Sequence, residues 1–131
     1  MGALIDTSVF IAIERGVLSL DRIEGRDEEV AISVVTASEL LHGVERANTP
    51  NRRHQRSRFV EAVLALVPVV SADLEVARVH ARVTAQLAMQ GQTIGVHDGW
   101  IASTALVLGF SVATRNLREF SRVENLRVEQ W

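Results

Sequence analysis

The sequence predicts an α/β fold: a three-layer α/β/α domain with a central, mainly parallel sheet of about five strands. Three observations support this. Short apolar runs without polar alternation are typical of strands that are buried on both faces. Between them lie segments with helical spacing of apolar residues, and strands that alternate with helices favour a parallel sheet. The length of 131 residues, with no repeat and no change of composition, predicts one domain over residues 1–131.

The apolar runs place the expected strands in order along the chain. Each run is four to six residues long and is followed by a polar or helical segment, as expected for roughly 5-residue buried strands. The expected strands are ALID (3–6), AISVV (31–35), VPVV (67–70), GFSVAT (109–114) and LRVEQ (126–130).

The segments between these strands have apolar residues at helical spacing, which predicts helices. In the second helix, for example, Leu40, Leu41, Val44 and Ala47 lie on one side. A turn is expected around Gly91, between two of the helices. The expected helices are 7–15, 36–47, FVEAVLAL (59–66) after an arginine-rich segment at 51–58, 71–90, 94–109 and 117–120.

The composition of the chain excludes several classes of protein and several kinds of site. Hydrophobic residues make up 47% and charged residues 23%, and no apolar run approaches the ~18 residues of a membrane span. No secretion leader is evident, so we expect a cytoplasmic protein without membrane contact. Cysteine is absent, which excludes disulfides, thiolate zinc sites and cysteine nucleophiles. All 14 basic residues are arginine, so Walker A phosphate binding and Schiff-base chemistry by lysine are excluded as well.

Asp98 stands at the head of an apolar stripe in the segment IGVHDGWIASTALVLG. A carboxylate on that face points toward packed protein or into a cleft, where it needs a partner. The alternative is that Asp98 caps the helix, since aspartate is among the best N-cap residues. The residues that share its helical face are Ile101, Ala102, Ala105 and Gly109.

Further polar side chains follow the expected strands. Asp6 ends the first strand, Glu39 lies just past the second and Asn116 follows the fourth. In open parallel sheets, sites form outside the carboxyl ends of the strands. We therefore expect Asp6, Glu39, Asp98 and Asn116 to converge on one edge as candidate catalytic residues.

Each of these residues also has a purely structural explanation. Asp6 could cap its helix, although Thr7 and Ser8 are equally suitable caps. Thr36 and Glu39 have the spacing of a capping box. Asn116 taken alone would be an ordinary turn residue.

Carboxylates that cluster at close range raise one another's pKa, and a divalent cation relieves the repulsion. Oxygen ligands without cysteine favour Mg²⁺ or Mn²⁺ over zinc. Mg²⁺ keeps several waters and commonly takes only one or two carboxylates together with substrate phosphate. Such a site can activate water and neutralise a phosphodiester.

Four motifs occur in order along essentially the whole chain: LIDTSVFI (4–11), SVVTASELLHG (33–43), IGVHDGWIASTALVLG (94–109) and VATRNLREFSRVENLRVEQW (112–131). With these motifs the chain resembles the PIN domains of VapC-type toxins from bacterial toxin–antitoxin modules. The resemblance implies a PIN-like fold and a Mg²⁺- or Mn²⁺-dependent endoribonuclease that leaves a 5′-phosphate and a 3′-hydroxyl. It also implies a VapB-type antitoxin, a homodimer and an RNA substrate, such as a tRNA or ribosomal RNA loop.

The resemblance also assigns roles to single positions. Asp6 and Asp98 match the principal metal-binding aspartates, and Glu39 matches a glutamate that acts through water. Asn116 falls where many relatives have a fourth acid, and it brings no negative charge to a second metal position. Glu119 would either compensate for this or lie on a solvated helical face.

Other residues are assigned supporting or alternative roles. Ser8 and Thr114 are expected to hold waters or neighbouring carboxylates behind the metal ligands. His97 could act as a general base, although the metal can itself supply hydroxide. The arginine-rich segment either grips an RNA backbone or is a solvated helix start. Its members are Arg52, Arg53, Arg56 and Arg58.

Two other functions remain open at this point. One is a PIN-type nuclease with a housekeeping role in RNA processing. The other is a non-catalytic RNA-binding module on the same fold, because fold alone does not fix function.

Overall fold

The computed structural model describes residues 2–131, and across them runs one five-stranded sheet in the order β3-β2-β1-β4-β5. Every neighbouring pair of strands is parallel, which confirms the expected α/β class. Leu4 at the centre lies opposite Ala31 on one side and Val112 on the other. The strands are β1 (Ala3–Ile5), β2 (Val30–Ser33), β3 (Val69–Val70), β4 (Ser111–Thr114) and β5 (Val128–Gln130).

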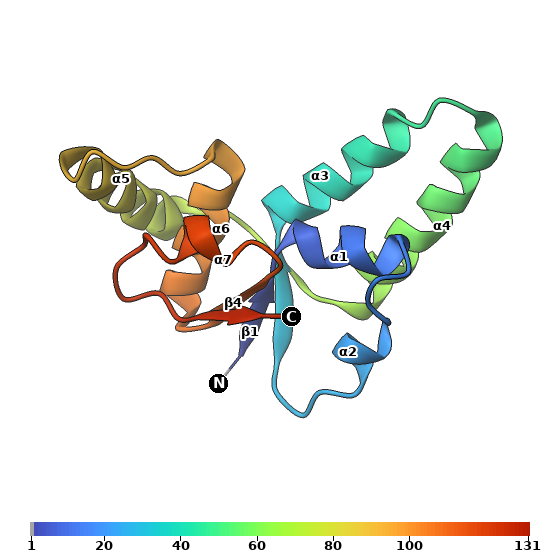
Figure 1. The fold of residues 1–131 in the computed structure, drawn as a ribbon, viewed down its shortest axis with the longest axis horizontal. Coiled ribbons are helices and arrows are strands. Elements are labelled where there is room, and N and C mark those ends of the chain that lie inside the picture. Colours follow the sequence, from blue (N-terminus) through green and yellow to red (C-terminus); the bar gives the residue numbers. More distant parts are fainter. Residues whose placement is uncertain (1) are drawn as a thin grey trace.

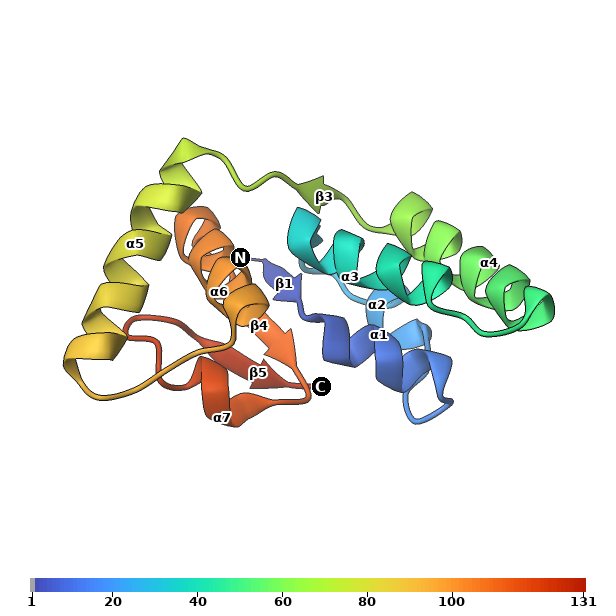
Figure 2. The same ribbon diagram turned by 90° about the horizontal axis from the view of Figure 1, so that it is seen from above.

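Helices cover both faces of the sheet, so the molecule has three layers (Figure 2). Helices α1 to α4 pack on one face and α5 to α7 on the other. None of the helices within residues 2–131 has the length and apolar character needed to cross a bilayer. The helices are α1 (Thr7–Glu14), α2 (Asp21–Glu24), α3 (Val34–Glu45), α4 (Pro50–Leu66), α5 (Leu74–Met89), α6 (Val96–Leu108) and α7 (Leu117–Phe120).

The short strands supply both core layers because successive side chains point to opposite faces. Ile5 and Ile32 belong to the core under α1, α3 and α4, whereas Leu4 and Ala31 belong to the core under α5 and α6. All four side chains are buried. This explains why the strand segments read as uninterrupted apolar runs in the sequence.

The strand order places a switch point at the middle of the sheet. From β1 the chain moves outward through β2 to β3, then crosses back to add β4 and β5 on the other side of β1. The carboxyl ends of β1 and β4 are therefore neighbours, and the residues that follow them meet although they are far apart in sequence. In open α/β sheets this is where ligands bind.

Two helices begin earlier than the sequence pattern indicates. Helix α3 starts at Val34, not at residue 36, because Ser33 is its N-cap and its Oγ accepts a hydrogen bond from Val35 N at 3.1 Å. Helix α4 starts at Pro50, so the arginine-rich segment is helical throughout. Thr49 caps it and proline occupies its first turn, where the missing N–H is harmless.

Two further elements differ from the expectation. Helix α5 begins at Leu74, after the N-cap Asp73, and not at Ser71. The short helix α2 was not predicted; its four residues bury only Ile23, which is too little apolar surface to produce a periodic signal. The turn at Gly91 is confirmed, with a φ of +68° that favours glycine.

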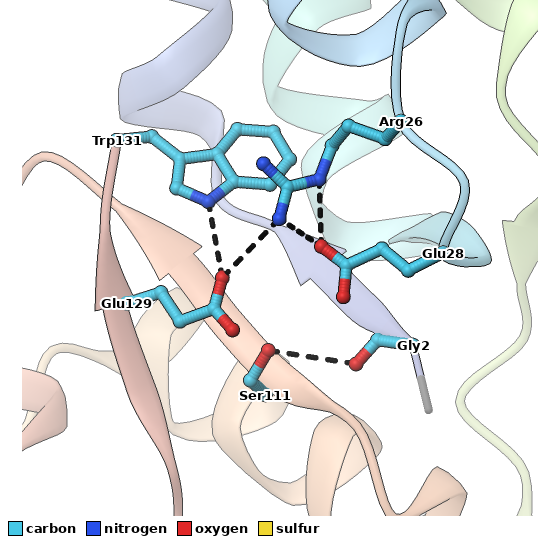
Figure 3. Close-up of polar contacts among 6 residues, drawn as sticks. All are labelled: Gly2, Arg26, Glu28, Ser111, Glu129 and Trp131. Atoms are coloured by element: carbon cyan, nitrogen blue, oxygen red, sulfur yellow. Dashed lines mark hydrogen bonds and ion pairs between the residues drawn. The ribbon is translucent and has the colours of Figure 1, made fainter.

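The end of the chain is fixed by a group of side chains that we call the Arg26 cluster: Arg26, Glu28, Glu129 and Trp131 (Figure 3). The guanidinium of Arg26 lies 4.1 Å from the centre of the buried Trp131 ring. It forms ion pairs with Glu28 and, at 3.6 Å, with Glu129. Trp131 Nε1 also donates to Glu129 Oε2 at 3.2 Å. The cluster thus ties the segment after β5 to the loop between α2 and β2.

Candidate active site

Asp6 is the first residue after β1 and is only 5% exposed. Its Oδ2 accepts hydrogen bonds from Ser8 Oγ at 2.6 Å and from Thr114 Oγ1 at 2.8 Å. Thr114 comes from the end of β4, so the neighbouring ends of the two strands join here. Burial raises the pKa of the Asp6 carboxyl, and the hydroxyls of Ser8 and Thr114 oppose this by hydrogen bonding to the charged form.

The two hydroxyls are themselves oriented by backbone amides. Ser8 Oγ accepts from Arg115 N at 3.0 Å, and Thr114 Oγ1 accepts from Asn116 N at 2.9 Å. Asp6 stands at the N-cap position of α1, but its side chain makes no capping hydrogen bond. Its carboxylate is therefore held by side-chain hydroxyls and does not serve as a helix cap.

Glu39 projects from α3 toward the start of α1. Its Oε1 accepts a hydrogen bond from Thr7 Oγ1 at 2.8 Å, and its Oε2 lies 3.2 Å from His97 Nδ1. The capping-box interpretation is wrong, because Ser33 caps the helix and Thr36 already lies inside it. Glu39 is thus directed to the switch point by contacts from α1 and α6.

Asp98 lies in the first turn of α6, whose N-cap is Gly95. The capping interpretation of Asp98 is therefore wrong as well. Its carboxyl is half-buried, and its pKa is raised from 3.8 to about 7. Burial is the largest cause, followed by the charge of Asp6, the charge of and a hydrogen bond to Glu119, and the charge of Glu39.

Glu119 does not lie on a solvated face. It is partly buried, and its Oε1 accepts a hydrogen bond from the Gly95 backbone N–H at the start of α6. The sequence alone does not decide between a buried and a solvated Glu119. The direction of its side chain depends on how the four-residue helix α7 packs through Phe120, which is fully buried. The available signal was its position after the fourth strand, at the same sheet edge. We call Asp6, Glu39, Asp98 and Glu119 the acidic cluster.

Asn116 lies beside this cluster but is exposed. Within residues 2–131 its side chain makes no hydrogen bond, and its backbone N–H contributes by orienting Thr114. Glu119, three residues further along the chain, is the residue that brings a fourth carboxyl group to the cluster.

The donor set of the acidic cluster fits a hard divalent cation. The side chains of all four members offer carboxylate oxygens, and burial followed by the charges of the other members raises the pKa of Asp98. Across the described residues, the ion pair between Glu39 and His97 is the only one that reaches the cluster. In this part of the chain, no group of three or more His, Asp or Glu side chains is arranged to hold a metal ion. Mg²⁺ commonly takes only one or two protein carboxylates and completes its shell with water.

A cleft of about 710 Å³ opens beside the cluster, between α1 and α3. Thr7, Glu39 and His97 line it on the side of the acidic cluster. We call it the α1–α3 cleft. Its size is in the range of ligand-binding clefts.

The four arginines of the arginine-rich segment lie on α4, and three of them make internal contacts. Arg53 donates to Glu45 O at 3.1 Å and Arg56 to Gly43 O at 3.1 Å, so both bind carbonyls near the C-terminus of α3. Arg52 donates to Asn48 Oδ1 at 3.2 Å. Arg56 lines the α1–α3 cleft, and Arg58 is exposed.

Trp100, next to the site on α6, stacks on His80 of α5 with ring centres 3.9 Å apart and planes within 9°. Its ring is therefore occupied by a contact within the α5–α6 layer. Burial lowers the pKa of His80, which favours the neutral ring in this stack.

Comparison with known proteins places the chain in a family. The model of the PIN domain family matches residues 3–126. The chain is 38% identical to Ribonuclease VapC1 of Rickettsia felis over 128 residues, 98% of this chain and 95% of the relative. It is 33% identical to the tRNA(fMet)-specific endonuclease VapC of Shigella flexneri, over 85% of this chain and 82% of the relative.

Among solved structures, DNA-bound VapBC from Salmonella typhimurium matches with a TM-score of 0.91 and 28% identity. The match covers all of this chain and 98% of the other. The fold, the placement of the acidic cluster at the switch point and these matches lead to one conclusion. This chain belongs to the PIN-domain family and, within it, to the VapC ribonucleases.

Proposed function

We propose that this protein is the toxin of a type II toxin–antitoxin module, an endoribonuclease that depends on Mg²⁺ or Mn²⁺ and is neutralised by a VapB-type antitoxin. The acidic cluster at the switch point is the observation that carries the proposal. Burial and, after it, the charges of the other members raise the pKa of Asp98 to about 7, as expected for a site that works with a bound cation. The names of the relatives, ribonuclease and endonuclease VapC, support the same activity.

In this proposal Asp6 and Asp98 hold the cation. When bound, a divalent cation supplies an activated water and neutralises charge on the phosphodiester. Glu39, fixed by Thr7, and Asn116 orient the attacking water. Glu119 supplies the fourth negative charge that Asn116 lacks.

Ser8 and Thr114 act behind these residues. Their hydrogen bonds to Oδ2 of Asp6 fix the direction of its carboxylate and favour its charged form, which opposes the rise in pKa that burial causes. In the reaction, the oxygen of a water adds to phosphorus and the bond from phosphorus to the 3′ oxygen breaks. The 3′ oxygen takes up a proton, which leaves a 3′-hydroxyl and a 5′-phosphate.

The proposed partners are an RNA, such as a tRNA or ribosomal RNA loop, a VapB-type antitoxin and a second copy of the chain. Solved VapBC complexes with the same fold support an antitoxin partner. The match over nearly the full length of a VapC relative favours the toxin over a housekeeping nuclease. We propose that the protein acts in the cytoplasm as a single PIN domain over residues 1–131.

The test is cleavage of total cellular RNA by the purified protein in Mn²⁺ or Mg²⁺, with mapping of the new ends. We expect discrete cuts that disappear in EDTA and in an Asp98→Asn variant. The matched control is Asp73→Asn, because Asp73 is the exposed N-cap of α5 and asparagine caps equally well. This control should cleave like the unaltered protein.

Two outcomes would contradict the proposal. Cleavage at the full rate by the Asp98→Asn variant would show that Asp98 does not hold the cation. No cleavage in either metal by a protein that still binds RNA would favour the non-catalytic RNA-binding module.

A further inference from the structure

The α1–α3 cleft has two ends of opposite character. Both helices start at the carboxyl ends of neighbouring strands, and they touch there through the hydrogen bond from Thr7 to Glu39. From that point they leave the sheet and diverge (Figure 1). Arg15 and Arg46 are the C-caps of α1 and α3, and both line the cleft.

The arginines lie well away from the acidic cluster. At 1.5 Å per residue, the rise along α1 from Thr7 to Arg15 is about 12 Å, and the rise along α3 from Glu39 to Arg46 is about 10 Å. The cleft therefore leads from carboxylates at its inner end to two guanidiniums at its outer end.

We propose that Arg15 and Arg46 form a phosphate-binding pair that holds an RNA strand in the α1–α3 cleft while one of its phosphodiesters reaches the acidic cluster. This inference rests on the proposed function, because it names the residues that position the substrate of that activity. Neither residue belongs to the arginine-rich segment that the sequence indicated.

The guanidiniums of Arg15 and Arg46 are both available to a ligand. Arg15 and Arg46 are exposed, and with the described residues they make neither an ion pair nor a side-chain hydrogen bond. Arg56, which lines the same cleft, differs: it pairs with Glu14 at 3.3 Å and donates to Gly43 O. Arg15 and Arg46 are thus the arginines of the cleft whose donors are available to a ligand.

The charge of the outer part of the cleft also favours a polyanion. The chain carries a net charge of −2, yet the outer part of this cleft carries two unpaired cations. Of the acidic residues that line it, Glu14 is paired with Arg56, and Glu39 contacts Thr7 and His97. A polyanion is the ligand that matches such a cleft, and the planar guanidinium fork binds phosphate oxygens in pairs.

A purely local role for these arginines makes a different prediction. A cation at a helix C-terminus interacts favourably with the helix dipole. If that were their whole role, replacing both would lower stability slightly and leave RNA affinity unchanged.

The experiment measures RNA binding in EDTA, where the proposed cleavage is blocked. Fluorescence anisotropy of a short fluorescein-labelled single-stranded RNA gives the association constant at several salt concentrations. The variants are Arg15→Gln with Arg46→Gln, and a charge-matched control, Arg22→Gln with Arg82→Gln, at exposed positions outside the cleft.

We expect the cleft variant to bind more weakly than the control. The slope of log K against log salt should become shallower by about 1.4, since each phosphate contact to a single strand contributes roughly 0.7. Replacing both residues by lysine keeps the charges and should keep most of the slope. In Mg²⁺ or Mn²⁺, the glutamine pair should raise KM and leave kcat nearly unchanged, because the lost contacts serve binding.

The inference is overturned by an unchanged slope in the cleft variant or by an equal change in the control. It is also overturned if the variant loses the VapB-type antitoxin but keeps its RNA affinity, because the cleft then serves a protein partner. Failure of the proposed function looks different. In that case RNA binding depends on Arg15 and Arg46 while the unaltered protein cleaves no RNA.

Discussion

The acidic cluster and the Arg26 cluster both gather carboxylates, but they neutralise them in different ways. Around Arg26, the chain itself supplies the cation that pairs with Glu28 and Glu129. In the acidic cluster, His97 beside Glu39 is the one basic partner within residues 2–131. There burial and the neighbouring carboxylates together raise the pKa of Asp98 to about 7.

The difference is the one expected between a structural charge group and the proposed catalytic one. Burial of uncompensated carboxylates costs stability, so such a group is retained only where something else, such as a bound cation, completes it. The Arg26 cluster needs nothing from outside the chain. Substitutions in the two clusters should therefore affect different properties of the protein.

The largest expected effect is on cleavage. Asp6→Asn should lower the rate at least about 100-fold, which exceeds the usual effect of residues that only support metal ligands. The matched change in the other cluster, Glu129→Gln, should leave the rate within a factor of about two, because Glu129 contacts Trp131 and Arg26 and not the site. Initial rates on one mapped RNA measure both. Comparable losses of cleavage rate in the two variants would show that the two clusters do not differ in function.

The next effect is on stability as pH changes, measured in EDTA. The pKa of Asp98 is about 7 in the folded protein and ordinarily 3.8, so the folded state binds more protons between these values. The free energy of unfolding contributed by Asp98 therefore falls as pH rises from 3.8 to about 7 and stays low above it. An asparagine at position 98 does not ionise, so the variant does not lose this free energy of unfolding as pH rises.

Urea denaturation of the Asp98→Asn variant should show this directly. Its advantage in free energy of unfolding over the unaltered protein should grow across that interval and level off above it. Saturating Mg²⁺ should raise the stability of the unaltered protein and reduce the difference, because the cation binds the folded state. A difference that is constant with pH would mean that Asp98 is not perturbed.

The smallest effect is expected in the Arg26 cluster. Arg26→Gln removes the stacking on Trp131 and the ion pairs with two glutamates, and we expect a loss of about 1 kcal/mol of stability. RNA cleavage should be retained. Arg22→Gln on α2 is the control, at an exposed position where changes are usually within about 0.5 kcal/mol. A loss of cleavage in the Arg26→Gln variant would mean that the cluster supports the site and not only the chain end.

Much of the fold follows from local sequence, because buried parallel strands and amphipathic helices each leave a distinct pattern. The boundaries that were misplaced have local causes. Val34 and Val35 continue the β-branched run of β2, so only the cap at Ser33 reveals that they are helical. Pro50 after Thr49 marks the start of α4, which the arginine-rich composition obscured.

The candidate site was predictable to the extent that it lies at strand ends. Asp6, Glu39 and Asp98 could be expected together because the carboxyl ends of parallel strands share one edge. For Glu119 the sequence left two alternatives, because its direction depends on how the short helix α7 packs. Arg15 and Arg46 could not be expected together: each is an isolated arginine in the sequence, and only the divergence of two helices brings them to one cleft.

The strand order has a consequence for synthesis on the ribosome. Chains emerge from the N-terminus onward, and Asp6 meets Thr114 only after β4 has been added beside β1, late in translation. A nascent chain that ends before α6 carries Asp6 and Glu39 but lacks Asp98, Thr114 and Glu119. The proposed nuclease would thus stay inactive on the ribosome until its last helices and strands are made.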